Sequence, residues 1–202
     1  MQEEIVVKVP TTEALTPAQI TQKAEDLGVT KTEMSFGRSF ALSIMAGAFI
    51  AMGAMFFSLV VGDPALPFAI QRVLGGFLFC LGLILVVVAG AELFTGNTMI
   101  VMTAASKRIK WSAVWKNWIV VFFGNFLGAL VIVGLVFLSD MSAMNGGQVG
   151  QTMVSVAAGK MHADWLVLFA KGIMCNFLVC LGVWMAYASK TVADKILAVV
   201  FP

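Results

Sequence analysis

The stretch Val88-Ala-Gly-Ala-Glu-Leu-Phe-Thr-Gly-Asn-Thr98 interrupts a long apolar segment with an acid, two glycines and an amide. The segment covers residues 73–105, and as one unbroken helix it would be about 50 Å long. The hydrocarbon core of a bilayer is only about 30 Å thick, so one continuous helix fits it poorly. Glycine tolerates irregular dihedral angles, and Glu, Thr and Asn side chains can satisfy backbone groups released from a helix. We therefore expect the helix to break within this stretch.

A break at membrane depth also bears on function. Backbone that is not helical is tolerated there only where protein buries it or where it lines a polar cavity. A broken span is therefore the best pointer in a membrane-protein sequence to a transport site. We interpret this stretch as part of a transport route.

The composition of the chain is that of a membrane protein. Of its 202 residues, 60% are apolar and 12% are charged, and the mean hydropathy is +0.95. Such a chain has too little polar surface to coat a soluble globule. The net charge of +2 comes without a long basic block, so we expect no nucleic acid partner. The sequence predicts an all-α, polytopic helical bundle in a lipid bilayer.

The three cysteines, Cys80, Cys175 and Cys180, all fall inside predicted spans, and none forms a Cys-x-x-Cys pair. We interpret them as small buried hydrophobes rather than as disulfides or metal ligands. We expect neither a metal nor a cofactor. The N-terminus lacks the basic and short apolar regions of a cleaved signal peptide, so we expect none.

The order of segments follows from the apolar runs. We expect a mobile tail over residues 1–15, and then a short amphipathic helix over 16–28 that begins at a capping box. This helix lies on the membrane surface or against a neighbouring subunit, or is simply solvated. The remaining segments are spans at 34–61, 73–105 (interrupted), 117–138 and 165–188, a polar loop at 139–164, and a last apolar start at 196–202. We divide the chain into a cytoplasmic tail and helix, 1–33, and a partial transmembrane channel domain, 34–202.

Basic residues predict the orientation. One side of the expected bundle carries the residues Lys8, Lys23, Lys31, Arg38, Lys107, Arg108, Lys110, Lys116, Lys190 and Lys195, whereas the loops of the other side carry only Arg72 and Lys160. The positive-inside rule places the richer side, and with it the N-terminus, in the cytoplasm. The three basic clusters, at the N-terminal tail, at 107–116 and at 190–195, fall on the same side of the membrane only if the interrupted segment crosses it once.

Three patterns together resemble the formate/nitrite transporter family. They are Gly90-Ala-Glu-Leu-Phe-Thr-Gly-Asn-Thr98, Lys116-Asn-Trp118 with Gly124-Asn-Phe-Leu-Gly128, and Lys171-Gly-Ile-Met-Cys-Asn-Phe-Leu-Val-Cys-Leu-Gly-Val-Trp-Met185. The resemblance covers nearly all of residues 16–202. It implies an aquaporin-like fold whose second and fifth of six spans are broken, and a homopentamer with one pore per protomer. It also implies passage of small weak-acid anions such as formate, nitrite or hydrosulfide.

The sequence departs from this family at its end. The family pattern has a full fifth span, a sixth span and a pore histidine, all of which would lie beyond Pro202. The single histidine, His162, falls in the expected polar loop, and we interpret it as a surface residue. We expect the chain to be truncated within its fifth transmembrane segment, with the last one to two spans missing.

Candidate pathway residues come from the fourth span and from the interrupted segment. Lys171 is a candidate anion attractor, unless it snorkels to the interface. Asn176 and Val179 are three residues apart and share a helix face, where Asn176 donates either to the anion or to another helix. The resemblance implies that Phe79 and Leu83 line an apolar constriction, although core packing is the alternative.

The interrupting stretch itself supplies the remaining candidates. We expect Leu93 to form the constriction on the cytoplasmic side. The Thr95 hydroxyl is expected to hold an oxyanion and help supply a proton, or to cap a half-helix that begins near Thr98. Glu92 is expected to structure the loop by accepting backbone hydrogen bonds, since a negative charge in the route would repel the substrate. The other loop-structuring candidates are Gly90, Gly96 and Asn97.

These features predict a channel or proton-coupled carrier rather than an enzyme, for formate or nitrite, in a bacterial-type cytoplasmic (inner) membrane. A hydrosulfide channel is an alternative within the same family, because filter shape decides among small singly charged anions. An alternative of another class is the membrane anchor subunit of a redox enzyme complex. Haem anchors need axial ligands inside their spans, and no histidine lies in a predicted span.

Overall fold

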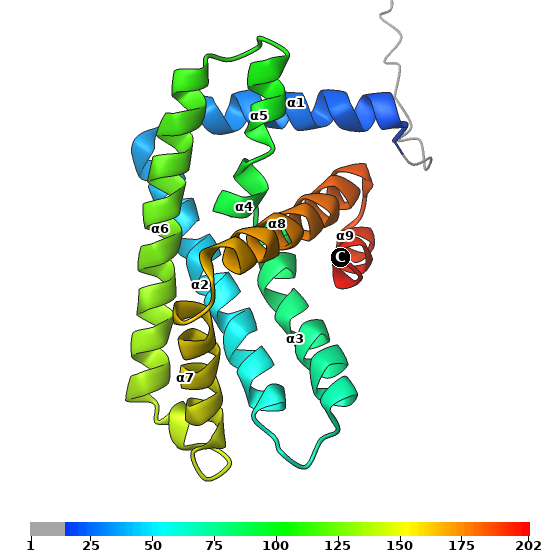
Figure 1. Ribbon diagram of the computed structural model, residues 1–202. Coiled ribbons are helices and arrows are strands. Elements are labelled where there is room, and N and C mark those ends of the chain that lie inside the picture. Colours follow the sequence, from blue (N-terminus) through cyan, green and yellow to red (C-terminus); the bar gives the residue numbers. More distant parts are fainter. Residues whose placement is uncertain (1–14) are drawn as a thin grey trace, which may run out of the picture.

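A computed structural model describes residues 15–202, so the expected tail at 1–15 lies outside the described residues except for Leu15. The described chain is all-α (Figure 1). Its elements are α1 Pro17–Glu33, α2 Phe36–Val61, α3 Phe68–Ala89, α4 Phe94–Asn97, α5 Ile100–Ala105, α6 Trp111–Leu138, the 3-10 turn η1 Met141–Ala143, α7 Gln148–Met161, α8 Trp165–Ala188 and α9 Val192–Val200. Among these, α2, α3, α6 and α8 are long and apolar enough to cross a membrane.

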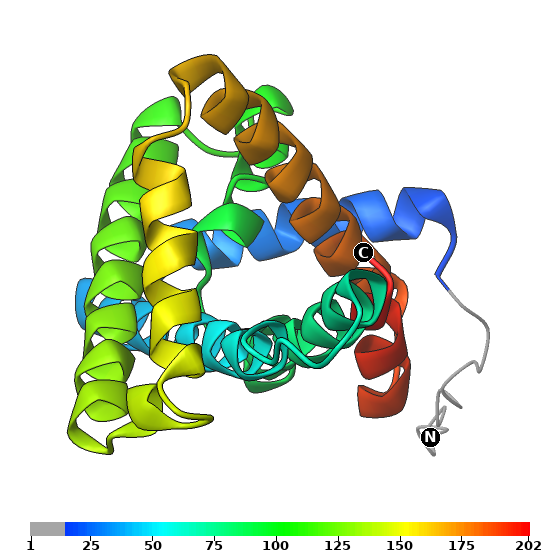
Figure 2. The same cartoon turned by 60° about the horizontal axis from the view of Figure 1, so that its bottom comes forward.

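The long helices are arranged around α2. This helix packs against α3 on one side and α6 on the other, whereas α1 lies crosswise over one end of the bundle (Figures 1 and 2). The short helix α5 reaches up to α1, and α8 passes obliquely beside α4. Large apolar side chains such as Phe77, Phe123 and Phe169 are exposed along the outer faces of the long helices, as expected of surfaces that meet lipid or other helices.

Glycines allow α2 and α6 to cross closely. A Cβ atom added to Gly124 would collide with the side chain of Ser43, and one added to Gly128 would collide with the carbonyl oxygen of Ile44. A Cβ added to Gly47 would collide with the backbone of Asn125 in the opposite direction. The four-residue spacing of Gly124 and Gly128 thus places both glycines on the face of α6 that crosses α2 closely.

The predicted break in the second span is confirmed. Helix α3 ends at Ala89 and is capped by Gly90, whose left-handed φ of 69° suits glycine. Residues 91–93, here called the junction, are non-helical, and α4 begins at Phe94. The half-helix after the break was predicted to begin near Thr98, and this start is wrong. The amide of Asn97 already donates to the Leu93 carbonyl at 2.8 Å and closes a helical turn around Thr95.

Two other sequence predictions differ from the structure. The polar loop predicted at 139–164 contains the helix α7, whose apolar residues Val149, Met153 and Val156 recur at helical spacing and whose Val149 is buried. The first helix continues past Gly28 to Glu33. Gly28 lies inside that helix and serves packing instead. A Cβ there would collide with the side chain of Thr103 on α5.

Candidate functional site

The junction inserts Leu93 into the middle of the bundle. Its side chain is 9% exposed and packs in a buried cluster with Ala46 of α2 and Val86 of α3. Leu83 of α3 and Val179 of α8 pack against this cluster. Three residues predicted from separate segments to line the route, Leu83, Leu93 and Val179, are thus brought together in one apolar cluster.

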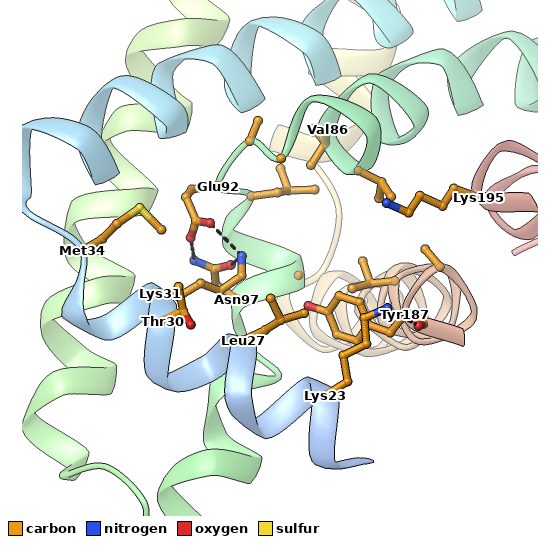
Figure 3. A pocket seen from close by; sticks show the side chains of 17 residues that line it. Lys23, Leu27, Thr30, Lys31, Met34, Val86, Glu92, Asn97, Tyr187 and Lys195 are labelled. Carbon is orange, nitrogen blue, oxygen red and sulfur yellow. Dashed lines mark hydrogen bonds and ion pairs between the residues drawn. The ribbon is translucent and has the colours of Figure 1, made fainter. Parts of the chain in front are cut away.

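A buried polar network lies on the side of the junction that faces α1 (Figure 3). The Lys31 ammonium donates to Glu92 Oε1 at 2.9 Å and to Asn97 Oδ1 at 2.7 Å. The Asn97 amide nitrogen donates in turn to Glu92 Oε2 at 2.7 Å and to Asn117 Oδ1 at 2.9 Å. Glu92 is 3% and Asn97 1% exposed, so the carboxylate is compensated by a cation and by an amide rather than by water.

A single side chain of α6 holds the junction backbone. Asn125 Nδ2 donates to the carbonyl oxygens of Glu92 and Ser43, each at 2.8 Å, and its Oδ1 accepts from the Phe94 amide at 2.8 Å. The Glu92 carbonyl and the Phe94 amide are groups that an unbroken helix would have satisfied internally. The Asn125 side chain therefore replaces two of the helix bonds that the junction lost.

A second polar cluster lies on the side of α4 that faces α8. The Thr98 hydroxyl donates to the Thr95 carbonyl at 2.6 Å and accepts from Asn176 Nδ2 at 3.1 Å. Cys180 lies one turn after Asn176, with its Sγ 3.4 Å from Thr98 Oγ1 and 3.7 Å from the Thr95 carbonyl oxygen. All four residues are only partly buried, and none is charged.

A cavity of about 340 Å³ opens between α1, the junction and α8, and carries three lysines on its walls (Figure 3). Lys31 is neutralised by Glu92. Lys23 donates to the carbonyl oxygen of Tyr187 at 2.7 Å, and burial together with the nearby charge of Lys195 lowers its pKa. The cavity therefore has a net positive charge and suits an anion.

Residues 18–202 match the sequence profile of a family described as formate/nitrite transporter. This chain belongs to that family. It is 37% identical over 190 residues to the formate channel FocA of Haemophilus influenzae, covering 94% of this chain and 67% of the relative. It is 40% identical over 189 residues to the formate channel FocA of Escherichia coli K12, covering 93% of this chain and 66% of the relative. The chain thus spans about two thirds of the length of these curated relatives.

Solved structures agree with this family membership. A pentameric formate channel with formate bound matches with a TM-score of 0.77 and 38% identity, over 83% of this chain and 66% of that chain. An FNT family ion channel matches with a TM-score of 0.81 and 27% identity, over 91% of this chain and 74% of that chain. The helical channel fold that the resemblance implies is confirmed.

The remaining sequence-predicted residues of this formate/nitrite transporter family member lie apart from the apolar cluster. Phe79 is 39% exposed on α3, one turn before Leu83. Lys171 is exposed on α8. Thr95 lies in the first turn of α4 and is not its N-cap, because that position belongs to Leu93. Gly96 lies on the same short helix and faces Val183 of α8.

The partners of Glu92 differ from the prediction. The sequence predicts that its carboxylate accepts backbone hydrogen bonds, whereas the structure gives it the side chains of Lys31 and Asn97. A buried carboxylate needs a cation more than it needs neutral donors, and α1 supplies one. The backbone of Glu92 is held instead by the carbonyl of Leu42, to which its amide donates at 3.2 Å, and by Asn125.

Sequence reasoning missed several residues that hold the junction. In the sequence analysis Lys31 serves only to predict the orientation in the membrane, and Asn117 and Asn125 appear in family patterns without a role. Trp118 was also missed, although its indole donates to the Asn97 carbonyl at 3.0 Å. An available signal was the presence of two amides inside an otherwise apolar span, because such groups rarely face lipid.

Proposed function

We propose that this protein is a membrane channel or carrier for small monovalent anions of weak acids, with formate or nitrite as substrate and hydrosulfide as the alternative. The observation that carries the proposal is the broken span, whose junction places Leu93 in the apolar cluster against which Leu83 and Val179 pack. The formate channels among the relatives support the same substrate class.

Electrostatics favours a route of this kind. An ion at mid-bilayer is costly, so a permeating anion needs donors or protonation to its neutral acid. The cationic cavity beside Lys23 and Lys195 gathers anions at one end, and Lys171 does so from the other side. Between these ends, the apolar side chains strip water, while the Thr95 hydroxyl and the Asn176 amide donate hydrogen bonds. Phe79 extends the apolar constriction by one turn.

The other predicted residues shape the route in this proposal. Gly90 turns the chain out of α3, Gly96 lets α4 approach α8, and Glu92 and Asn97 keep the junction in place. The protein acts as a homopentamer with one route per protomer, a state supported by the pentameric formate channel that it resembles. It lies in a bacterial-type inner membrane with its N-terminus and α1 in the cytoplasm, and residues 34–202 form the channel domain.

Flux measurements in liposomes test this function. Vesicles that contain the purified protein and a pH-sensitive dye should change internal pH rapidly when formate or nitrite is added, and protein-free vesicles should not. Leu93→Trp should block this response because the indole fills the constriction. Leu138→Trp is the matched control, since Leu138 is 80% exposed at the end of α6 and should leave the flux intact. Absence of a response from the unmodified protein to formate, nitrite and hydrosulfide would reject the proposal.

A further inference from the structure

Asn125 binds the backbone on both sides of Leu93. Its Nδ2 donates to the carbonyl oxygen of Glu92, the residue before, and its Oδ1 accepts from the amide of Phe94, the residue after. Both distances are 2.8 Å. One planar amide thus fixes the two peptide groups that set the direction in which the Leu93 side chain points.

Asn125 is itself fixed to the rest of the bundle. Its Nδ2 also donates a hydrogen bond to the Ser43 carbonyl oxygen of α2, at 2.8 Å. The close crossing of α2 and α6, where Gly47 touches the backbone of Asn125, leaves this residue little freedom to shift. The close contact between α2 and α6 therefore fixes Asn125, and Asn125 in turn fixes the backbone on either side of Leu93.

We propose that Asn125 is a positioning residue that sets the size limit of the anion route by holding Leu93 in the constriction. This inference rests on the proposed function, in which Leu93 forms that constriction. Residues 91–93 have no helix of their own to keep their shape, so without the amide the junction can move away from Leu83 and Val179. A wider constriction admits carboxylates larger than formate.

The test compares lactate flux with formate flux in liposomes. Asn125→Leu keeps the size of the side chain and removes all three hydrogen bonds, so the ratio of lactate to formate flux should rise about tenfold, with a smaller change in formate flux alone. Asn125→Asp keeps an acceptor for the Phe94 amide but turns a carboxylate oxygen toward the Glu92 and Ser43 carbonyls, so it should raise the ratio at least as much. It also carries the test if Asn125→Leu fails to assemble by gel filtration.

Thr103→Val is the matched control. Thr103 is fully buried on α5, which packs against α1, and its hydroxyl donates to the Glu25 carbonyl of α1 at 3.4 Å rather than to the junction. This variant should lower the melting temperature yet keep the flux ratio. An unchanged ratio in assembled Asn125 variants, or an equal rise in Thr103→Val, would overturn the inference while the unmodified protein still conducts formate. Failure of the unmodified protein to conduct formate would instead count against the proposed function.

Discussion

Toward α1 and α6 the chain around the junction meets a buried ion pair and two amides, whereas toward α8 it meets a hydroxyl, an amide and a thiol. On the first side, Glu92 and Asn97 are almost fully buried and every bond between them and Lys31 is short. On the second side, Thr98 and Asn176 are partly exposed, and the contacts between their side chains are 3.1 and 3.4 Å long, because the Thr98 hydroxyl is shared with the Thr95 carbonyl. The first side has the chemistry of a fixed support, and the second has donors that can exchange partners with a passing anion.

The difference also has an energetic meaning. A buried charged pair contributes little net stability when intact, yet it is costly to break because one charge is left without a partner. A partly exposed neutral cluster costs little to form and little to disturb. We therefore expect substitutions on the α1 side to change stability, and substitutions on the α8 side to change flux.

Loss of the Lys31 ammonium should have the largest effect. Lys31→Met leaves the carboxylate of Glu92, whose side chain is 4% exposed, without its cation. The free energy of unfolding should fall by about 3–5 kcal/mol. Thermal melting of the detergent-solubilised protein measures this change.

Two further variants control the Lys31 experiment. Lys107→Met removes a lysine that is exposed in the loop before α6 and should leave the melting temperature nearly unchanged. Adding Glu92→Gln to Lys31→Met removes the unpaired charge and should recover part of the loss. If Lys31→Met melts like Lys107→Met, the polar network does not support the junction.

Two matched substitutions, each of an asparagine by leucine, test the distinction between the two sides directly. Asn117→Leu removes the acceptor of the Asn97 amide and should lower the free energy of unfolding by about 1–3 kcal/mol. Asn176→Leu removes a donor to Thr98 on the other side, and should reduce formate flux about tenfold with a smaller change in melting. Equal ratios of flux loss to stability loss in the two variants would contradict the distinction.

The sequence predicts the break itself because its cause is local. Gly90 and the polar residues after it cannot continue an apolar helix, and the span is too long for a bilayer. The support of the break is not local, since Lys31 lies 61 residues before Glu92 and reaches it only when α1 lies across the bundle. Sequence reasoning could therefore identify Glu92 as a loop-structuring residue without finding its cation.

Short-range geometry explains the other differences. The sequence predicts that the half-helix begins near Thr98, because the polar run ends there. The helix begins instead at Phe94, whose amide donates to Asn125. Helix α7 escapes prediction because glycine and polar residues are mixed with its apolar ones, and Val149 is its one buried residue. At Phe94 a tertiary contact thus outweighs the local pattern.

The cationic cavity should show a moderate effect on the rate of anion entry. Lys195→Gln removes one of the lysines that line the cavity, and formate uptake at low ionic strength should slow about twofold to tenfold. Added salt should shrink the difference, because salt screens exposed charges. Lys107→Gln is the control of equal charge change outside the cavity. A slowing that is independent of salt would indicate a role other than electrostatic attraction.

The ion pairs that attach α1 to the loop before α6 should show the smallest effect. Arg108 bonds Asp26 at 2.7 Å and Glu25 at 3.4 Å, and both contacts are exposed. The hydrogen bond from Arg108, and then one from Gln22, lowers the pKa of Asp26 from its ordinary 3.8. Because the pKa is lower in the folded protein, this contact stabilises above pH 3.8 and its contribution is lost as the pH falls through the lowered pKa.

Arg108→Gln should therefore lower the melting temperature slightly at neutral pH, and the two proteins should converge as Asp26 becomes protonated. Melting curves from pH 3 to pH 7, at low and high salt, measure the convergence. Salt should reduce the difference at neutral pH, since exposed pairs are readily screened. A difference between the proteins that stays constant across this pH range would mean that Arg108 acts through packing against α1. A pH-dependent difference would place this contact in the middle of α1 among exposed ion pairs, in contrast to the buried Lys31 and Glu92 pair in the last turn of the same helix.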